Sequence, residues 1–191
     1  MDNLGGGNKE VKMSLKDFQV GKELINKAKE FATKCHEGQF RKFDKKPYIV
    51  HPAAVASLVD QYGGSPEMVA AAWLHDVVED CDVSYRDLIA EFGTKVSGLV
   101  WELTSPKDLN KSKKAEYLLD KMNTMTSDAL TIKLCDRLNN VSDFKTAPQG
   151  FVQKYAPETK FILDGLESGG RPLSAQQIKI IDEIRKVINQ F

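Results

Sequence analysis

Apolar residues return every three or four positions along most of this chain, which is the spacing of one face of an α-helix. The first such stretch begins at Ser14 and stops before Gly38, a residue type that commonly ends helices. Similar stretches predict further helices at residues 53–62, 66–80, 84–93, 94–103, 115–125, 127–144, 151–166 and 174–190. No strand-like alternation is evident, so we expect a compact all-α bundle of about eight to ten helices.

Residues with capping chemistry support several of these boundaries. Ser84 and Ser174 each stand three residues before an acid or an amide, the arrangement that caps a helix N-terminus. Gly93 is expected to stop the helix that Ser84 opens. Pro52 disfavours helical geometry at the residue before it, so His51 is expected immediately outside the helix whose first turn holds the proline.

The two ends of the chain carry different expectations. Residues 1–13 contain three consecutive glycines, scattered charges and few apolar side chains, so they are expected to form a flexible lead. Residues 14–191 are long enough to form a single domain with its own hydrophobic core. Near the C-terminus, isoleucines at helical spacing between Ile178 and Ile188 predict a packing helix that serves either the core or the contact of a homodimer.

Composition excludes some classes of function. The 191 residues include 27 Lys and Arg against 27 Asp and Glu, a balance that argues against a general nucleic-acid or anionic-membrane binder. No apolar run approaches the roughly 20 residues of a membrane span, and the first residues show no signal-peptide core. Three widely separated cysteines without C-x-x-C spacing fit a reducing compartment, so a cytoplasmic location is expected.

Candidate chemistry centres on the segment Trp73-Leu-His-Asp-Val-Val-Glu-Asp80. On a continuous helix His75 and Glu79 lie four residues apart, as do Asp76 and Asp80, so all four side chains are expected on one broad face. Acids that follow so apolar a stretch are either solvated at its rim or neutralised by a partner such as a divalent cation. For an isolated His-Asp pair the first explanation is the more common one. Beside a metal, Glu79 and Asp80 could move protons or orient water.

Two residues elsewhere in the chain favour the metal interpretation. His51 stands at a predicted helix start, and Asp136 lies in another amphipathic helix with Asn140 one turn later. Together with His75 and Asp76 they supply two imidazoles and two carboxylates, a set that suits Mn²⁺, Fe²⁺ or Zn²⁺ and leaves positions open for water and substrate. We expect one manganese ion at this site, in preference to iron or zinc.

A basic segment at residues 41–46 precedes the first of these histidines. Four of its six residues are Lys or Arg. Such a run alone is more often a solvated loop, but next to His51 it is a candidate substrate site. The guanidinium of Arg41 could stack on a purine and Lys42 could bind phosphate, so this segment could hold both ends of a ligand that carries these groups.

Four longer strings carry a family resemblance: His36-Glu-Gly-Gln-Phe-Arg-Lys42, Pro47-Tyr-Ile-Val-His-Pro52, Leu74-His-Asp-Val-Val-Glu-Asp80 and Leu134-Cys-Asp-Arg-Leu-Asn-Asn140. His51, the pair His75-Asp76 and Asp136 resemble the H…HD…D metal signature of the HD phosphohydrolase superfamily. In order and spacing the strings are similar to motifs of the Rel/Spo-type (p)ppGpp hydrolase domain, over residues 15–165. With no residues left for a synthetase domain, the chain resembles the single-domain small alarmone hydrolases, including the Mesh type.

This resemblance implies an HD-domain fold and an activity. The activity is Mn²⁺-dependent removal of the 3′-pyrophosphate from ppGpp or pppGpp, which yields GDP or GTP and pyrophosphate. The implied metal ligands are His51, His75, Asp76 and Asp136. The implied catalytic residues, which act on the attacking water and the departing 3′-oxygen in an unresolved division of roles, are Glu79 and Asp80. The implied substrate contacts are Arg41, Lys42 and Asn140.

Several alternatives stay open from sequence. The same metal site could act on another nucleotide, such as the 2′-phosphate of NADPH, or the chain could bind an alarmone without turnover. Asp143 stands where the bifunctional enzymes usually carry threonine, which leaves the substrate contacts open. His36 is interpreted as a capping or packing histidine. Cys81 and Cys135, which adjoin site acids, are interpreted as inert thiols, the alternative being oxidation that displaces a neighbouring carboxylate.

Overall fold

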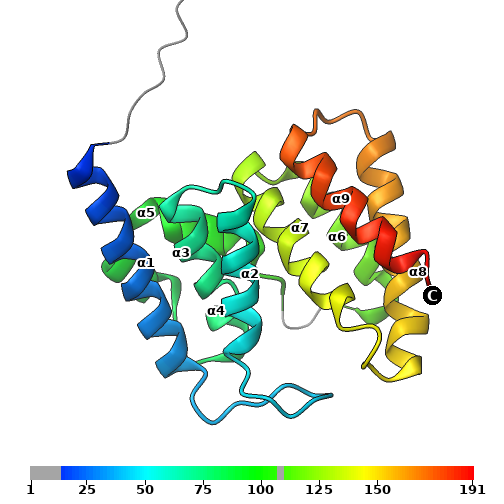
Figure 1. Cartoon of the computed structure of the whole chain (residues 1–191), viewed down its shortest axis with the longest axis horizontal. Helices are drawn as coiled ribbons and strands as arrows, with labels where there is room; N and C mark the ends of the chain where they lie inside the picture. The colour runs from blue at the N-terminus through cyan, green and yellow to red at the C-terminus, as the bar shows by residue number, and fades with distance from the viewer. Residues whose placement is uncertain (1–13, 107–109) are drawn as a thin grey trace, which may run out of the picture.

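The computed structural model describes residues 14–106 and 110–191, and there the chain forms nine α-helices and one short 3₁₀-helix (Figure 1). The α-helices are α1 (Leu15–Cys35), α2 (Val50–Gln61), α3 (Pro66–Leu74), α4 (Val77–Asp80), α5 (Tyr85–Leu103), α6 (Lys114–Thr124), α7 (Ser127–Ser142), α8 (Gln149–Ser168) and α9 (Ala175–Ile188). The 3₁₀-helix Lys111–Lys113 runs directly into α6. The expected all-α class is confirmed; the expected flexible lead at residues 1–13 lies outside the described residues.

Helix α3 forms the centre of the first half of the bundle. Its residues from Met68 to Ala72 and Leu74 are buried, and it packs against α1, α2, α5 and α7. Gly21 allows α1 to approach closely, because a Cβ atom there would lie 2.8 Å from Cγ of Pro66 at the start of α3. An apolar helix therefore stands behind the residues that carry the candidate chemistry.

Helix α7 connects the two halves of the bundle. In Figure 1, α1 to α5 lie on one side and α6 to α9 on the other, and α7 contacts α2 across the division. The C-terminal helix α9 packs against α7 and α8 and buries Ile180, Ile181, Ile184 and Ile188. Of the two roles expected for this helix, the structure therefore shows the contribution to the core.

The predicted boundary at Gly93 appears as a kink. The stretches 84–93 and 94–103 form one element, α5, in which Gly93 has a φ of 75° and leaves the helical geometry. A glycine adopts this left-handed conformation without the clash that a Cβ atom causes. Ser84 caps α5 as expected, with its side chain accepting a hydrogen bond from the backbone N–H of Asp87.

The predicted continuous helix over residues 66–80 was wrong. Helix α3 ends at Leu74, and α4 begins only at Val77, so His75 and Asp76 form a turn between them. The carbonyl oxygen of Ala72 lies 2.8 Å from Nδ1 of His75 and takes part in a side-chain hydrogen bond. Neighbouring residues on a continuous helix point about 100° apart. The break therefore allows His75 and Asp76 to face the same point, and the single helical face expected for the four residues does not form.

The expectation that His51 lies outside its helix was also wrong. Helix α2 begins at Val50, which places His51 and Pro52 in its first turn. The first N–H groups of a helix have no partner within it, so a proline there removes no hydrogen bond. His51 is 5% exposed and faces the interior.

Candidate functional site

Three separate parts of the fold bring two histidines and two aspartates together. His51 comes from α2, His75 and Asp76 from the turn between α3 and α4, and Asp136 from the middle of α7. Asp136 Oδ1 lies 3.2 Å from His51 Nε2 and 3.9 Å from His75 Nε2. Asp76 Oδ2 lies 3.1 Å from His75 Nε2 and 3.7 Å from His51 Nε2. We call these four residues, the predicted metal ligands, the metal cluster.

Both imidazoles of the metal cluster are held by a hydrogen bond at Nδ1, the ring nitrogen away from the carboxylates. His51 Nδ1 donates a hydrogen bond to Oδ1 of Asn139 at 2.7 Å, and His75 Nδ1 donates to the carbonyl oxygen of Ala72 at 2.8 Å. These bonds leave Nε2 of each ring as the atom that faces the carboxylates. Metal-binding histidines usually have this arrangement, in which the second ring nitrogen is bonded to an oxygen acceptor.

The carboxylates of the metal cluster also have partners, two of which sequence reasoning missed. The Tyr48 hydroxyl donates to Asp76 Oδ2 at 2.6 Å, and Lys133 Nζ donates to Asp136 Oδ2 at 2.9 Å. Lys133 stands three residues before Asp136 on the same helix, a spacing that could have identified it. Neither Tyr48 nor Asn139 carries a comparable signal, because each meets its partner across a long stretch of chain.

Burial and charge together shift the pKa values of the metal cluster. Burial alone lowers the pKa of His75, but Asp76 and Asp136 outweigh it and raise that pKa to about 9. Burial alone raises the pKa of Asp136, but Lys133 and the two imidazoles hold it well below its usual value. Burial also opposes ionisation of Asp76, and the imidazoles reverse the shift and lower its pKa. The cluster therefore holds two carboxylates in their charged form.

The chemistry of the metal cluster fits a divalent cation. His75 Nε2 is buried and has no hydrogen-bond partner among the described residues, although Asp76 Oδ2 lies 3.1 Å away. One ligand atom from each of His51, His75 and Asp136 lies within 4.8 Å of the other two. A cation among two imidazoles and two carboxylates would satisfy the unpartnered nitrogen and neutralise buried negative charge.

Glu79 and Asp80 follow the metal cluster on α4. Both line a cleft that is also lined by His51, Asp76 and Asp136 of the metal cluster. Glu79 is partly buried, and its Oε1 accepts a hydrogen bond from the backbone N–H of Ser105 at 2.5 Å. Burial is the main cause that raises the pKa of Glu79. Asp80 is exposed. The two adjacent acids therefore differ in environment, one sheltered from water and the other open to it.

The predicted substrate residues border this cleft, which has a volume of about 560 Å³. Arg41 and Lys42 line it from residues 40–47, which we call the basic loop, and Asn140 lines it from α7. Asn140 Nδ2 donates to Asp136 Oδ1 at 2.8 Å, which joins the substrate side to the metal cluster. Of the predicted site residues, His75 alone is not part of the lining, because it lies beneath the cleft at 2% exposure.

Three aromatic rings form a wall of the cleft beside the basic loop. The rings of Phe43 and Phe151 have centroids 4.8 Å apart, and Phe151 and Tyr155 are stacked at 5.1 Å with an interplanar angle of 20°. All three residues line the cleft. Flat aromatic surfaces of this kind are suited to contact with a planar base. The cleft thus has a charged metal end and an aromatic end.

His36 and the cysteines have structural surroundings. His36 is 2% exposed at the end of α1, and its ring lies 4.8 Å from that of Tyr48, in agreement with a packing role. Cys81 donates its S–H to the carbonyl oxygen of Cys35. Burial raises the pKa of Cys81 to about 11 and that of Cys135 to about 12, which favours inert thiols.

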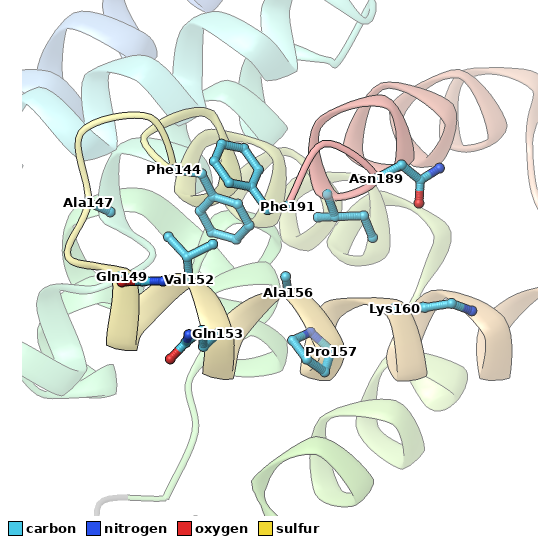
Figure 2. A pocket seen from close by; sticks show the side chains of 11 residues that line it. Phe144, Ala147, Gln149, Val152, Gln153, Ala156, Pro157, Lys160, Asn189 and Phe191 are labelled. Carbon is cyan, nitrogen blue, oxygen red and sulfur yellow. The ribbon is translucent and has the colours of Figure 1, made fainter.

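A second hollow of the same volume, about 560 Å³, lies between α8 and the end of α9 (Figure 2). Figure 2 shows Phe144 and Phe191 close together above Val152 and Ala156 of α8. Among the residues that line this hollow, Lys160 alone is charged. A cavity identifies a candidate active site when titratable groups with shifted pKa values converge on it. Charge, and not volume, therefore distinguishes the cleft at the metal cluster.

Known proteins resemble this chain in sequence and in structure. MESH1 of Xenopus tropicalis, named a guanosine-3′,5′-bis(diphosphate) 3′-pyrophosphohydrolase, is 34% identical over 151 residues, which cover 75% of this chain and 84% of that protein. A protein of Synechocystis sp., named a probable enzyme of the same activity, is 37% identical over 145 residues. That match covers 73% of this chain but 19% of the Synechocystis protein.

A solved structure described as "A metazoan ortholog of SpoT hydrolyzes ppGpp and plays a role in starvation responses" has a TM-score of 0.75 and 29% identity. The match covers 85% of this chain and 94% of that one. Among the described helices we find none with the length and hydrophobicity of a membrane span. The HD domain family matches residues 28–166, a range that contains every residue of the metal cluster. With more than half of its length matched in this way, the chain belongs to the HD domain family.

Proposed function

We propose that this chain, as one domain over residues 14–191, is a metal-dependent (p)ppGpp 3′-pyrophosphohydrolase. It would convert ppGpp or pppGpp and water into GDP or GTP and pyrophosphate. The observation that carries the proposal is the convergence of the metal cluster, two acids and a basic loop on one cleft. Relatives with 34% and 37% identity are named for this activity, which supports the choice of substrate. We place the protein in the cytoplasm, whose reducing conditions suit its free thiols.

Manganese is the ion that we propose, one per site. The residues that would hold it are His51, His75, Asp76 and Asp136. A divalent cation, when bound, lowers the pKa of a bound water and neutralises phosphate oxygens. Imidazole and carboxylate donors also accept Fe²⁺ and Zn²⁺, so these ions belong in the same titration.

Glu79 and Asp80 would move the protons of the reaction. Water attacks the phosphorus that carries the ribose 3′-oxygen, and the bond between this phosphorus and the 3′-oxygen breaks. Burial favours the protonated form of Glu79, so we assign Glu79 the donation of a proton to the departing 3′-oxygen. The exposed carboxylate of Asp80 would accept a proton from the attacking water.

The basic loop and α7 would hold the nucleotide. Arg41 and the aromatic pair Phe43 and Phe151 lie at the end of the cleft suited to the base. Lys42 would meet phosphate, and Asn140, which is bonded to a cluster aspartate, would contact the ribose or its 3′-phosphate. The chain has no net charge, so attraction for so anionic a ligand depends on this local concentration of cations.

One incubation tests substrate and reaction together. Purified protein with Mn²⁺ is mixed separately with ppGpp, pppGpp and NADPH, and the products are separated by anion exchange. We expect GDP or GTP with stoichiometric pyrophosphate from the first two substrates. Release of phosphate from NADPH alone would reassign the substrate, and binding of ppGpp without any product would make the chain a binding module. Light scattering of the same sample tests for a homodimer.

A further inference from the structure

The carboxylate of Asp143 lies behind the basic loop and outside the substrate space. Its Oδ2 is 2.6 Å from Nη2 of Arg41, and the two side chains are 36% and 18% exposed. Arg41 lines the cleft, whereas Asp143 lines a small crevice on the other side of Arg41, together with Thr146 and Ala147. The carboxylate of Asp143 therefore forms an ion pair with Arg41, and it does not line the cleft in which an anionic ligand would bind.

The position of Asp143 on α7 is unfavourable without a cationic partner. Asp143 is the C-cap of α7, where the partial negative charge of the helix end repels a carboxylate. Its backbone is fixed there, because its carbonyl oxygen accepts hydrogen bonds of 2.9 Å from the N–H groups of Thr146 and Ala147. The positive charge of the Arg41 guanidinium offsets the negative charge of the Asp143 carboxylate and the partial negative charge of the helix end. Each of the two side chains therefore stabilises the position of the other.

The same face of α7 carries Asp136, the residue that this helix contributes to the metal cluster. Asp136, Asn140 and Asp143 follow at spacings of four and three residues, which places them on one side of the helix. Seven residues of helix rise about 10 Å. Helix α7 therefore sets the separation between the metal end of the cleft, at Asp136, and the anchor of Arg41, at Asp143.

The two ends of the basic loop pair with each other, and Phe43 in its middle contacts Phe151 of α8. The Arg41 backbone N–H donates to the carbonyl oxygen of Lys46 at 2.8 Å, and Phe40 pairs with Pro47. These contacts hold the backbone of the loop but leave its long side chains free to turn. The bond to Asp143 takes the Nη2 edge of the guanidinium, and the same side chain also lines the cleft.

We propose that Asp143 is a positioning residue that holds Arg41 for nucleotide binding and so fixes the distance between the base contact and the metal cluster. The inference rests on the proposed function, since it takes the ligand to be a guanine nucleotide. Without Asp143, Arg41 would be free to turn toward the carboxylates of the metal cluster or toward the phosphates. Nucleotide affinity would then fall, while metal affinity and the proton-transfer residues would be unaffected.

The test measures the dissociation constant of GDP in the presence of Mn²⁺ by calorimetry, alongside kcat and KM for ppGpp. The variants are Asp143→Asn, Arg41→Ala and the double variant. Glu67→Gln is the matched control, since Glu67 is an acid of similar exposure, 31%, that pairs with Lys95 away from the cleft. We expect Asp143→Asn to weaken GDP binding and raise KM about fivefold, with kcat and Mn²⁺ affinity unchanged. The double variant should be no weaker than Arg41→Ala, because Asp143 acts through Arg41.

Unchanged GDP affinity in Asp143→Asn, or a loss that adds in full to that of Arg41→Ala, would overturn the inference. Asp143→Glu provides a second variant if the asparagine variant unfolds; it keeps the charge and should recover part of the affinity. The inference and the proposed function fail separately. A wild type that binds GDP but leaves ppGpp intact refutes the hydrolase, and the variants still decide the role of Asp143. A wild type that binds neither nucleotide refutes both.

Discussion

At one end of the cleft, His51, His75 and Asp136 are 5%, 2% and 7% exposed and come from elements that pack on one another. At the other end, Arg41 and Lys42 lie on a loop whose residues 42–47 are exposed. The apolar core behind the first group holds its donor atoms in place, as a metal site requires. The second group lies outside this core, and Arg41 is held there by its bond to Asp143 and by the backbone contacts of the loop. Substitutions at the metal end should therefore abolish the reaction, whereas those on the basic loop should change affinity.

The largest effect is expected from removal of a metal ligand. His75→Ala or Asp136→Ala should lose tight Mn²⁺ binding and lower turnover of ppGpp at least about 1000-fold, because only three of the four proposed ligands remain to hold the ion. Metal content by mass spectrometry and pyrophosphate release check this. Asp128→Ala, an exposed acid on the same helix as Asp136, is the control and should behave as the wild type.

Loss of a proton-transfer group should separate chemistry from metal binding. Glu79→Gln keeps the shape of the side chain but removes its proton, so turnover should fall about 100-fold to 1000-fold. Bound Mn²⁺ should stay at the wild-type level, since Glu79 is not one of the proposed ligands. A variant with full turnover would show that this residue moves no proton in the reaction.

Release of an imidazole from its acceptor should have a smaller effect at the same end. Asn139→Leu removes the oxygen that His51 Nδ1 bonds at 2.7 Å while keeping similar volume. We expect Mn²⁺ affinity to fall about 10-fold to 100-fold, as for other residues that orient metal ligands. Calorimetric titration of Mn²⁺ measures the change, and unaltered affinity would mean that packing alone orients the ring.

Substitutions on the basic loop should change KM, whereas those at the metal end change kcat. Arg41→Ala is expected to raise KM for ppGpp about tenfold with little change in kcat or in Mn²⁺ affinity, because the proposed contact of the guanidinium with the nucleotide is away from the reacting phosphorus. Arg41→Lys should recover little, since an ammonium lacks the flat face for stacking. A fall in kcat as large as that of Glu79→Gln would erase the distinction between the two ends of the cleft.

The smallest effect concerns stability and pH. Because burial raises the pKa of Glu79 in the folded state, the folded protein binds more protons than the unfolded chain in the range above about pH 4.5, and stability is lost as pH rises through it. Metal-free Glu79→Gln should therefore be more stable than the wild type at pH 7, by less than about 1 kcal/mol. The difference should shrink toward pH 4 in urea unfolding. A destabilised variant at pH 7 would contradict the assigned burial cost.

The helical elements were accessible from the sequence because each depends on local spacing and capping. The predicted stretch 127–144 appears as Ser127–Ser142, and 174–190 appears as Ala175–Ile188. The failure at residues 66–80 has a specific cause. Apolar periodicity continues through Leu74, but the Nδ1 atom of His75 bonds the carbonyl oxygen of Ala72 in the preceding turn, and the backbone departs from regular helix at the next residue, Asp76. A single side-chain contact of this kind leaves no trace in the periodicity.

The candidate site also contains residues that the sequence identified and residues that it did not. The motif strings singled out the residues that the fold gathers in one cleft, from His51 to Asp136, because their donor chemistry is visible in their types. The residues that orient them were missed, as Tyr48 and Asn139 are ordinary polar residues until a partner from another element faces them. From the sequence, Asp143 was an acid expected near an anionic ligand, and its effect on substrate binding was open. The structure answers this question with a direct bond to Arg41, 102 positions away.

The all-α class, the approximate helix boundaries and the residue types able to bind a metal and move protons were predictable from the amino-acid sequence. These depend on neighbours within a few positions or on the chemistry of single side chains. Three features emerge only in the folded protein: His75 and Asp76 both reach the metal cluster, Glu79 is sheltered while Asp80 is open, and Asp143 pairs with Arg41. Each of these depends on contacts between helices that the chain brings together only when its apolar faces are buried.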